Sequence, residues 1–493
     1  MSKVQRSRGG IAAGALLALC LAALPAVAQG DRPVTSKKDM GDTVKINVSG
    51  NLVLDYVWRS SEITQFTEGF SGPAPLINSS TNEGTFEGYA SIRIDAELSE
   101  KVSAVLEVGT KRVDGGLINE WGGNAGIASA EAIALREAGV RFSEILNPAV
   151  SVHIGLTNWA FDVRGKGSAF ALDPRHSQSI VRNLATSEDL GGGVADALTA
   201  RAGAPEEMEA VGAVVSYARD QIALNLVLLP AVLEGGSSNG DEALYALDFW
   251  YNLDTVGKGS RLGLVLARHS HPGRKSGFFT VGGGVDLMMM DGALELYGEA
   301  YFQFGDAGVN PVDGDDVDAG GMAVQIGLEY RFTGDIRPWV GVNFTLVSGD
   351  DDLLTTDDDA DGFASYENIN DLAIIENMYL GFDWDTNYQA IKVMGGIALS
   401  VGAGKNNLEL MAIFGFCNTA EDVQYAAPVG SEDALGNEFD VKARWILSKQ
   451  AAITGTFAYL TGSDILEQSM GGSGNTDSED NAMLFTLGAD LRF

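Results

Sequence analysis

The chain has 493 residues, with 67 acidic residues against 33 lysines and arginines and a formal net charge of −34 at neutral pH. A negative surplus of this size repels phosphate backbones, so nucleic-acid binding is excluded as a function. The mean hydropathy of +0.04 is high for a chain in which 20% of the residues are charged. This mixture suits strands that carry one apolar face and one polar face.

The N-terminus predicts a secretory signal over residues 1–28. Basic residues precede an apolar run there, and the small residues at 26–28 form a cleavage site. A short periplasmic lead, 29–43, follows the signal. Cys417 is then the only cysteine of the mature chain, which excludes an intramolecular disulfide.

From residue 44 to residue 493, segments with alternating apolar and polar residues follow one another. A period of two predicts strands with one dry side and one wet side. In chain order, the predicted strands cover residues 44–58, 86–99, 101–111, 133–144, 149–161, 209–220, 221–230, 243–254, 260–270, 276–290, 292–304, 320–332, 336–347, 390–401, 407–417, 437–447, 450–460 and 482–493.

The predicted strand number depends on the rule that it must be even. Residues 374–384 could form one more strand, but single-chain bacterial barrels have an even number of strands. We therefore assign this segment to a long external loop, 349–388, which matches a second long external loop at 162–208. The prediction is an all-β fold: a single transmembrane antiparallel β-barrel over residues 44–493, with about 18 strands, short periplasmic turns and long extracellular loops.

The distribution of charge along single strands agrees with a barrel. In the segment 292–304, apolar residues alternate with polar ones that are expected to point inward. An unpaired charge on the lipid face would cost about 2–4 kcal/mol at the bilayer midplane, so the polar set must face the interior. The expected inward residues of this strand are Glu295, Tyr297, Glu299, Tyr301 and Gln303.

The last strand ends the chain on Phe493. A terminal strand that closes on phenylalanine is typical of bacterial outer-membrane barrels, in which it is the signal read by the barrel-assembly machinery. We therefore predict the cell outer membrane as the location. The expected partners are this machinery, membrane lipid and lipopolysaccharide, and the sequence leaves the oligomeric state open.

The loop 162–208 begins with a basic cluster in a chain that is otherwise acidic. Long loops in wide barrels often fold inward, because the barrel would otherwise hold a broad water column. We predict that the loop forms a pore constriction opposite carboxylates on the barrel wall; the alternative is a loop that stands outside and binds lipopolysaccharide phosphates. The constriction candidates are Arg164, Lys166, Arg175 and Arg182 on the loop and Glu295, Glu299 and Glu329 on the wall.

The acidic loop 349–388 contains a partial calcium-loop pattern. Asp357, Asp359 and Asp361 occupy alternate positions and Gly362 follows them, so that their carboxylates could converge on one hard cation. The twelfth position is Asn368 instead of glutamate, so a full calcium-binding hand is not expected. The pattern predicts an exposed Ca²⁺ or Mg²⁺ site, with a solvated acidic loop as the alternative, and no other cofactor is expected.

The sequence does not predict an enzyme. Its 4 histidines form no metalloprotease motif, and no nucleophile-elbow motif occurs. A wide barrel with charges of both signs inside instead predicts a porin-type channel for the passive diffusion of small hydrophilic solutes.

Two segments resemble the alginate-export-like porins, a family of large eighteen-strand bacterial barrels. They are LVSGDDD at residues 346–352 and the long strand-and-loop segment at 152–177. The resemblance implies the same barrel fold. It does not carry over alginate as the substrate, because the expected lumen mixes both charge signs and does not focus anions. Export of an acidic polysaccharide and a structural or adhesive surface barrel remain the alternative functions.

Overall fold

The structure, a computed structural model, describes residues 44–61, 82–110, 133–145, 147–157, 161, 164, 170, 209–233, 242–270, 277–309, 316–349, 359–363, 371–376, 387–401, 407–424, 431–461 and 481–493. The predicted signal and periplasmic lead lie outside these ranges. Within them, no helix is both long enough and apolar enough to cross a membrane.

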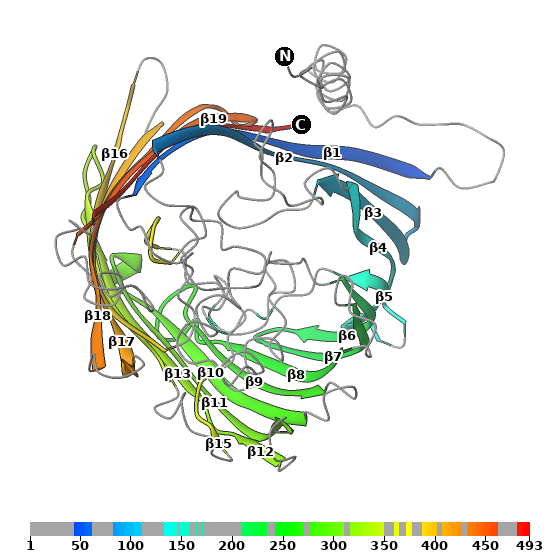
Figure 1. Ribbon diagram of the computed structural model, residues 1–493. Coiled ribbons are helices and arrows are strands. Elements are labelled where there is room, and N and C mark those ends of the chain that lie inside the picture. Colours follow the sequence, from blue (N-terminus) through cyan, green and yellow to red (C-terminus); the bar gives the residue numbers. More distant parts are fainter. Residues whose placement is uncertain are drawn as a thin grey trace, which may run out of the picture.

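Eighteen of the twenty described strands form one closed antiparallel barrel. Each barrel strand pairs with the next along the chain, and β1 (Lys45–Ser61) closes the ring by pairing with β20 (Asn481–Arg492). Figure 1 shows the strands as a single ring, with β1 and β2 beside β19 where the chain closes on itself. The predicted fold class and strand number are confirmed.

The strands between β1 and β20 follow the predicted ranges closely. The first group is β2 (Asn82–Ser99), β3 (Val102–Thr110), β4 (Ile133–Ser143), β5 (Val150–Thr157), β6 (Glu209–Arg219), β7 (Ile222–Leu233), β8 (Glu242–Asn252), β9 (Arg261–Ser270), β10 (Gly277–Met289) and β11 (Leu294–Val309). The second group is β13 (Met322–Arg331), β14 (Trp339–Val347), β16 (Tyr388–Leu399), β17 (Leu408–Gln424), β18 (Ser431–Ser448) and β19 (Ala451–Thr461).

Two short strands, β12 (Asp316–Ala319) and β15 (Asp359–Ala360), are additions to the barrel. They pair with each other in parallel, and β12 also pairs with the end of β11. They were not predicted, because segments of four and two residues are too short to show an alternating pattern.

The hairpin between β10 and β11 turns where the sequence predicts it. A one-turn 3₁₀ helix, η1 (Met290–Gly292), joins the two strands, and Asp291 there has a φ of 57°. Aspartate tolerates this left-handed conformation better than most residues, which explains why Asp291-Gly292 is a strong turn signal.

The strands separate an apolar outer face from a polar inner face. On β9, Leu262, Leu264 and Leu266 are exposed on the outside, whereas Val265 and His269 are buried on the inside. A closed barrel satisfies all its strand hydrogen bonds internally, and an apolar outer face is therefore stable in lipid. The strands of the barrel wall are therefore suited to span a membrane.

The interior of the barrel contains chain segments from both long loops. Phe170, from the loop 162–208, packs edge-on against Tyr301 of β11, with ring centroids 6.2 Å apart. The same ring packs edge-on against Phe363, from the loop 349–388, also at 6.2 Å. All three side chains are almost completely buried. The two long connections therefore meet against the inner wall.

Candidate functional site

A row of directly opposed residues crosses the inner wall from β11 to β18. The strand register pairs each member with the next on the neighbouring strand. We call this set the polar row. In order around the wall it consists of Tyr297, Gly327, Asn343, Lys392, Gly415 and Glu438.

The two glycines of the polar row make room for larger groups. A Cβ atom on Gly327 would lie 2.1 Å from Cζ of Tyr297, so the tyrosine ring covers this glycine. A Cβ atom on Gly415 would lie 2.6 Å from Cδ1 of Leu372, a residue of the loop 349–388. Gly415 therefore forms a notch between two charged residues, and the leucine side chain fills it.

A loop segment, Asp371–Glu376, is bound to the wall through its backbone and through its two acidic side chains. The Ile374 and Ile375 N–H groups donate to the two carboxylate oxygens of Glu438, at 2.7 and 2.8 Å. The Ala373 N–H donates to Oδ2 of Asp440 at 2.9 Å. Both carboxylates belong to β18 and are completely buried. The wall thus supplies the acceptors that three consecutive loop amides require.

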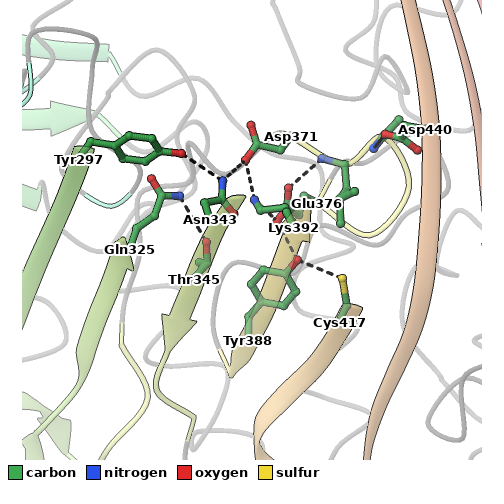
Figure 2. Close-up of polar contacts among 12 residues, drawn as sticks. Tyr297, Gln325, Asn343, Thr345, Asp371, Glu376, Tyr388, Lys392, Cys417 and Asp440 are labelled. Atoms are coloured by element: carbon green, nitrogen blue, oxygen red, sulfur yellow. Dashed lines mark hydrogen bonds and ion pairs between the residues drawn. The ribbon is translucent and has the colours of Figure 1, made fainter. Parts of the chain in front are cut away.

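Lys392 binds the same segment from the other side. Its ammonium group donates to Oδ2 of Asp371 at 2.6 Å and to Oε1 of Glu376 at 2.8 Å. The Tyr388 hydroxyl also donates to Glu376 Oε1, at 2.7 Å, and lies 3.4 Å from Sγ of Cys417 (Figure 2). Lys392 and Glu376 are both fully buried. A buried charge is stable only when it is paired and hydrogen-bonded, and Lys392 and Glu376 both meet these conditions.

Asp371 connects the segment to the rest of the polar row. The Asn343 side-chain amide donates to Asp371 Oδ2 at 3.1 Å, and Lys442 donates to the Asp371 main-chain oxygen. Partial desolvation against the wall raises the pKa of the half-buried Asp371 carboxyl, but the Lys392 ammonium and the Asn343 amide outweigh this effect and lower the pKa to about 2. The carboxyl group is therefore ionised at neutral pH.

This position adds a detail that the sequence did not predict. The connection 349–388 was expected to be a long external loop, and its residues 371–376 fold back into the barrel, where they contact the inward face of β16, β17 and β18. The physical reason is that inward acids on β18 and an inward lysine on β16 require partners, and this segment provides them. Residues 374–376 are not in a strand, in agreement with the parity argument, and 377–386 lie outside the described residues.

Arg164 is the predicted loop cation that the structure describes. Its Nη1 group donates to Oε1 of Glu299 at 3.2 Å and to Oε1 of Gln325 at 2.7 Å. The guanidinium also lies over the Tyr297 ring, 4.4 Å from the centroid. The structure therefore brings together Arg164 and Glu299, two of the predicted constriction residues. Lys166, Arg175 and Arg182 lie outside the described residues.

The other two predicted wall carboxylates have a different described partner. Glu295 and Glu329 are directly opposed on β11 and β13. Arg331 binds both, with nitrogen–oxygen distances of 2.9 Å to Glu295 and 2.6 Å to Glu329. Two like charges in direct opposition are destabilising, and Arg331 on the same face compensates for this.

The predicted cation site on the acidic loop stays a prediction. Asp357 lies outside the described residues, and Asp359 lies in β15, paired with Asp318. The Asp361 main-chain oxygen accepts a hydrogen bond from the Ser348 hydroxyl at 2.7 Å. Among the residues that the structure describes, no group of three or more His, Cys, Asp or Glu side chains is arranged to hold a metal ion.

The residues that hold the loop segment were missed as a site, although their signal is present in the sequence. Glu438, Asp440 and Lys442 alternate along β18, so all three must point inward. The two neighbouring acids outnumber the one lysine beside them on the inward face, so they favour further donors from another segment. This pattern could have predicted a segment docked on β18, but not which one.

Solved structures share the fold of this chain at low sequence identity. The crystal structure of Pseudomonas aeruginosa OccK3 (OpdO) aligns with a TM-score of 0.51 and 12% identity, over 91% of this chain and 95% of that chain. OccK9 (OpdG) from the same organism aligns at 0.51 with 11% identity, over 91% and 98%. OccK11 (OpdR) aligns at 0.50 with 12% identity, over 91% and 96%. No family model and no curated protein matches the sequence. The structural likeness supports the barrel fold.

Proposed function

We propose that this chain is an outer-membrane channel through which small hydrophilic solutes diffuse passively. The observation that carries the proposal is a closed barrel of membrane-spanning strands whose polar interior is narrowed by segments of two long loops. A barrel of this strand number without such segments would hold a wide water-filled channel. The inserted segments restrict it to a polar path for small solutes.

Charges of both signs are also present on the wall far from the polar row. Arg93 on β2 binds Glu137 on β4 at 2.5 Å and Glu107 on β3 at 3.1 Å. The interior therefore carries ion pairs on more than one side, which is suitable for polar solutes and does not favour export of a polyanion.

Planar bilayer recordings test the function. Purified full-length protein should give stepwise, ohmic increases in current without any energy source. Liposomes that contain it should swell in small sugars and resist larger ones, because the loops limit the size of the path. A bilayer that stays sealed in the presence of folded protein would favour a structural or adhesive surface barrel instead.

We also propose that Arg164, with Lys166, Arg175 and Arg182, lines the constriction. The contact of Arg164 with Glu299 and Gln325 supports an inward position for the start of this loop. Neutralising the four bases together should shift the reversal potential towards cation selectivity.

Two finer assignments have their own support. The main chain of Phe493 exchanges hydrogen bonds with Gly50 on β1 at 2.9 and 3.1 Å, so the terminal residue is part of the barrel seam and fits a role as the assembly signal. Deletion of Phe493 should reduce the amount of folded protein in the outer membrane. Kinship with alginate-export-like porins is supported by the segments 346–352 and 152–177 alone.

A further inference from the structure

The segment Asp371–Glu376 exposes one charge to the interior and hides the others. The Asp371 side chain is 42% exposed, whereas the side chains of Lys392 and Glu376 are 0% exposed. In Figure 2 one carboxylate oxygen of Asp371 points to Asn343 and Lys392, and the other points away from the strands. Lys392 thus binds one oxygen of the Asp371 carboxylate from the wall side, and the other oxygen faces the lumen.

The cations near this carboxylate are less accessible than it is. The Arg164 side chain is 13% exposed and is enclosed by Glu299, Gln325 and the face of Tyr297. The Lys442 side chain is 25% exposed, and its ammonium binds the Asp371 main chain and Asp440. Of these charged groups, the Asp371 carboxylate is the most accessible to a solute beside the polar row.

The net charge around the segment Asp371–Glu376 is also negative. Lys392 and Lys442 are the ammonium groups that bind this segment, and they face a larger number of carboxylates. These are Asp371, Glu376, Glu438 and Asp440. Carboxylates that line a pore favour cations, and low-dielectric walls strengthen the effect.

We propose that Asp371 is a specificity-determining residue, whose lumen-facing carboxylate makes the pore favour small cationic solutes, such as primary ammonium compounds and alkali cations, over anions. This inference rests on the proposed channel function. It assigns the selectivity to the loop segment that the polar row holds in place, with Lys392 as the positioning residue behind it.

The test is the reversal potential of Asp371→Asn in planar bilayers under a KCl gradient, repeated with ethylammonium chloride. The wild-type pore should favour K⁺ over Cl⁻, and the variant should lower this permeability ratio by about two- to fivefold. Asparagine keeps an oxygen that can accept from Lys392 and Asn343, so the segment should stay docked. Asp371→Glu, which keeps the charge, should retain the preference for cations.

Asp291→Asn is the matched control. It removes the same charge at the exposed tip of the β10–β11 hairpin, where asparagine tolerates the φ of 57°. Its permeability ratio should equal that of the wild type. An anion-selective wild type, an unchanged ratio in Asp371→Asn, or a lost preference in Asp371→Glu would overturn the inference and leave the channel function standing. A wild-type protein that conducts no current would instead overturn the proposed function itself.

Discussion

The two long loops reach the same inner wall by different means. The loop 162–208 contacts it through the Arg164 side chain, which binds Glu299 and Gln325. The loop 349–388 contacts it through three consecutive backbone N–H groups, which bind carboxylates of the wall, and through the Asp371 and Glu376 side chains, which bind Lys392. In the first case a side chain of the loop makes the contact, and in the second the wall also binds the main chain of the loop.

This difference explains why one contact could be predicted and the other could not. A basic cluster on a loop is visible in the sequence, because only some residues carry a positive charge. Every residue except proline carries a backbone N–H, so the three amide contacts leave no signature in the segment. Its two acids, Asp371 and Glu376, do not stand out in a loop that is acidic throughout. The information for the second loop lies in the inward acids of a distant strand.

The largest expected effect comes from Lys392→Met. The substitution leaves Asp371 and Glu376 without their ammonium partner, and breaking a buried ion pair costs about 3–5 kcal/mol. The segment Asp371–Glu376 should therefore detach while the barrel stays folded. Cys417 reports this change, because it is 1% exposed and belongs to the same buried cluster as Leu372 and Ile375. Its rate of maleimide labelling should rise at least tenfold, since about 1.4 kcal/mol corresponds to a tenfold change in an equilibrium constant.

Lys45→Met is the control for this experiment. Lys45 binds Glu97 at 2.8 Å in an exposed pair on β1, and such pairs contribute little stability. Labelling of Cys417 should stay slow in this variant. Equal labelling rates in Lys392→Met and the wild type would mean that the lysine does not hold the segment.

Glu438→Ala should have the next largest effect. It removes the acceptors of the Ile374 and Ile375 N–H groups, and each buried donor left without an acceptor costs about 1–3 kcal/mol. Amide hydrogen exchange of residues 371–376 should become much faster, as measured by mass spectrometry in detergent. Glu438→Gln keeps one oxygen acceptor and should give an intermediate rate. Slow exchange in both variants would contradict backbone recognition by the wall.

Arg164→Met should loosen the loop 162–208 and leave the loop 349–388 in place. A hydrogen bond to a charged group contributes about 1.5–3 kcal/mol, so the expected result is a larger and noisier single-channel current. Labelling of Cys417 should stay slow, because the segment 371–376 has its own contacts. Arg331→Met, whose described partners Glu295 and Glu329 belong to the wall, should change the current less. An equal change in both variants would show that Arg164 does not tether a loop.

The smallest effect is expected from Gly415→Ala. The new methyl group would overlap with Leu372 Cδ1, and a flexible side chain can move away at a cost of about 1 kcal/mol. Labelling of Cys417 should rise a few-fold. Gly455→Ala is the matched control, because its nearest atom would be the Thr486 oxygen at an ordinary 3.6 Å. If the control variant labels as fast as Gly415→Ala, the notch is not specific for the leucine.

The barrel itself could be predicted because its information is local. Alternation along each strand fixes which residues face the lipid, and Glu295 and Glu299 are buried on the inside as expected. The pairing of Arg164 with Glu299 could be predicted only in part. The sequence offered several loop bases and several wall acids as candidates and did not say which base contacts which acid. The polar row could not be predicted, because it depends on the register of β11 to β18 at once. A shift of one residue in any of these strands would turn its member of the row to the lipid.

The burial of Lys392 has a consequence for the order in which the molecule is assembled. Before the loop arrives, Lys392, Glu438 and Asp440 face a water-filled interior, so the barrel can close with these charges hydrated. The segment Asp371–Glu376 takes its partners from β14, β16 and β18, and they are in position only once those strands are in register. We therefore expect the finished wall to be the template on which the segment folds, and docking to be a late, separable step with a lower stability than the barrel.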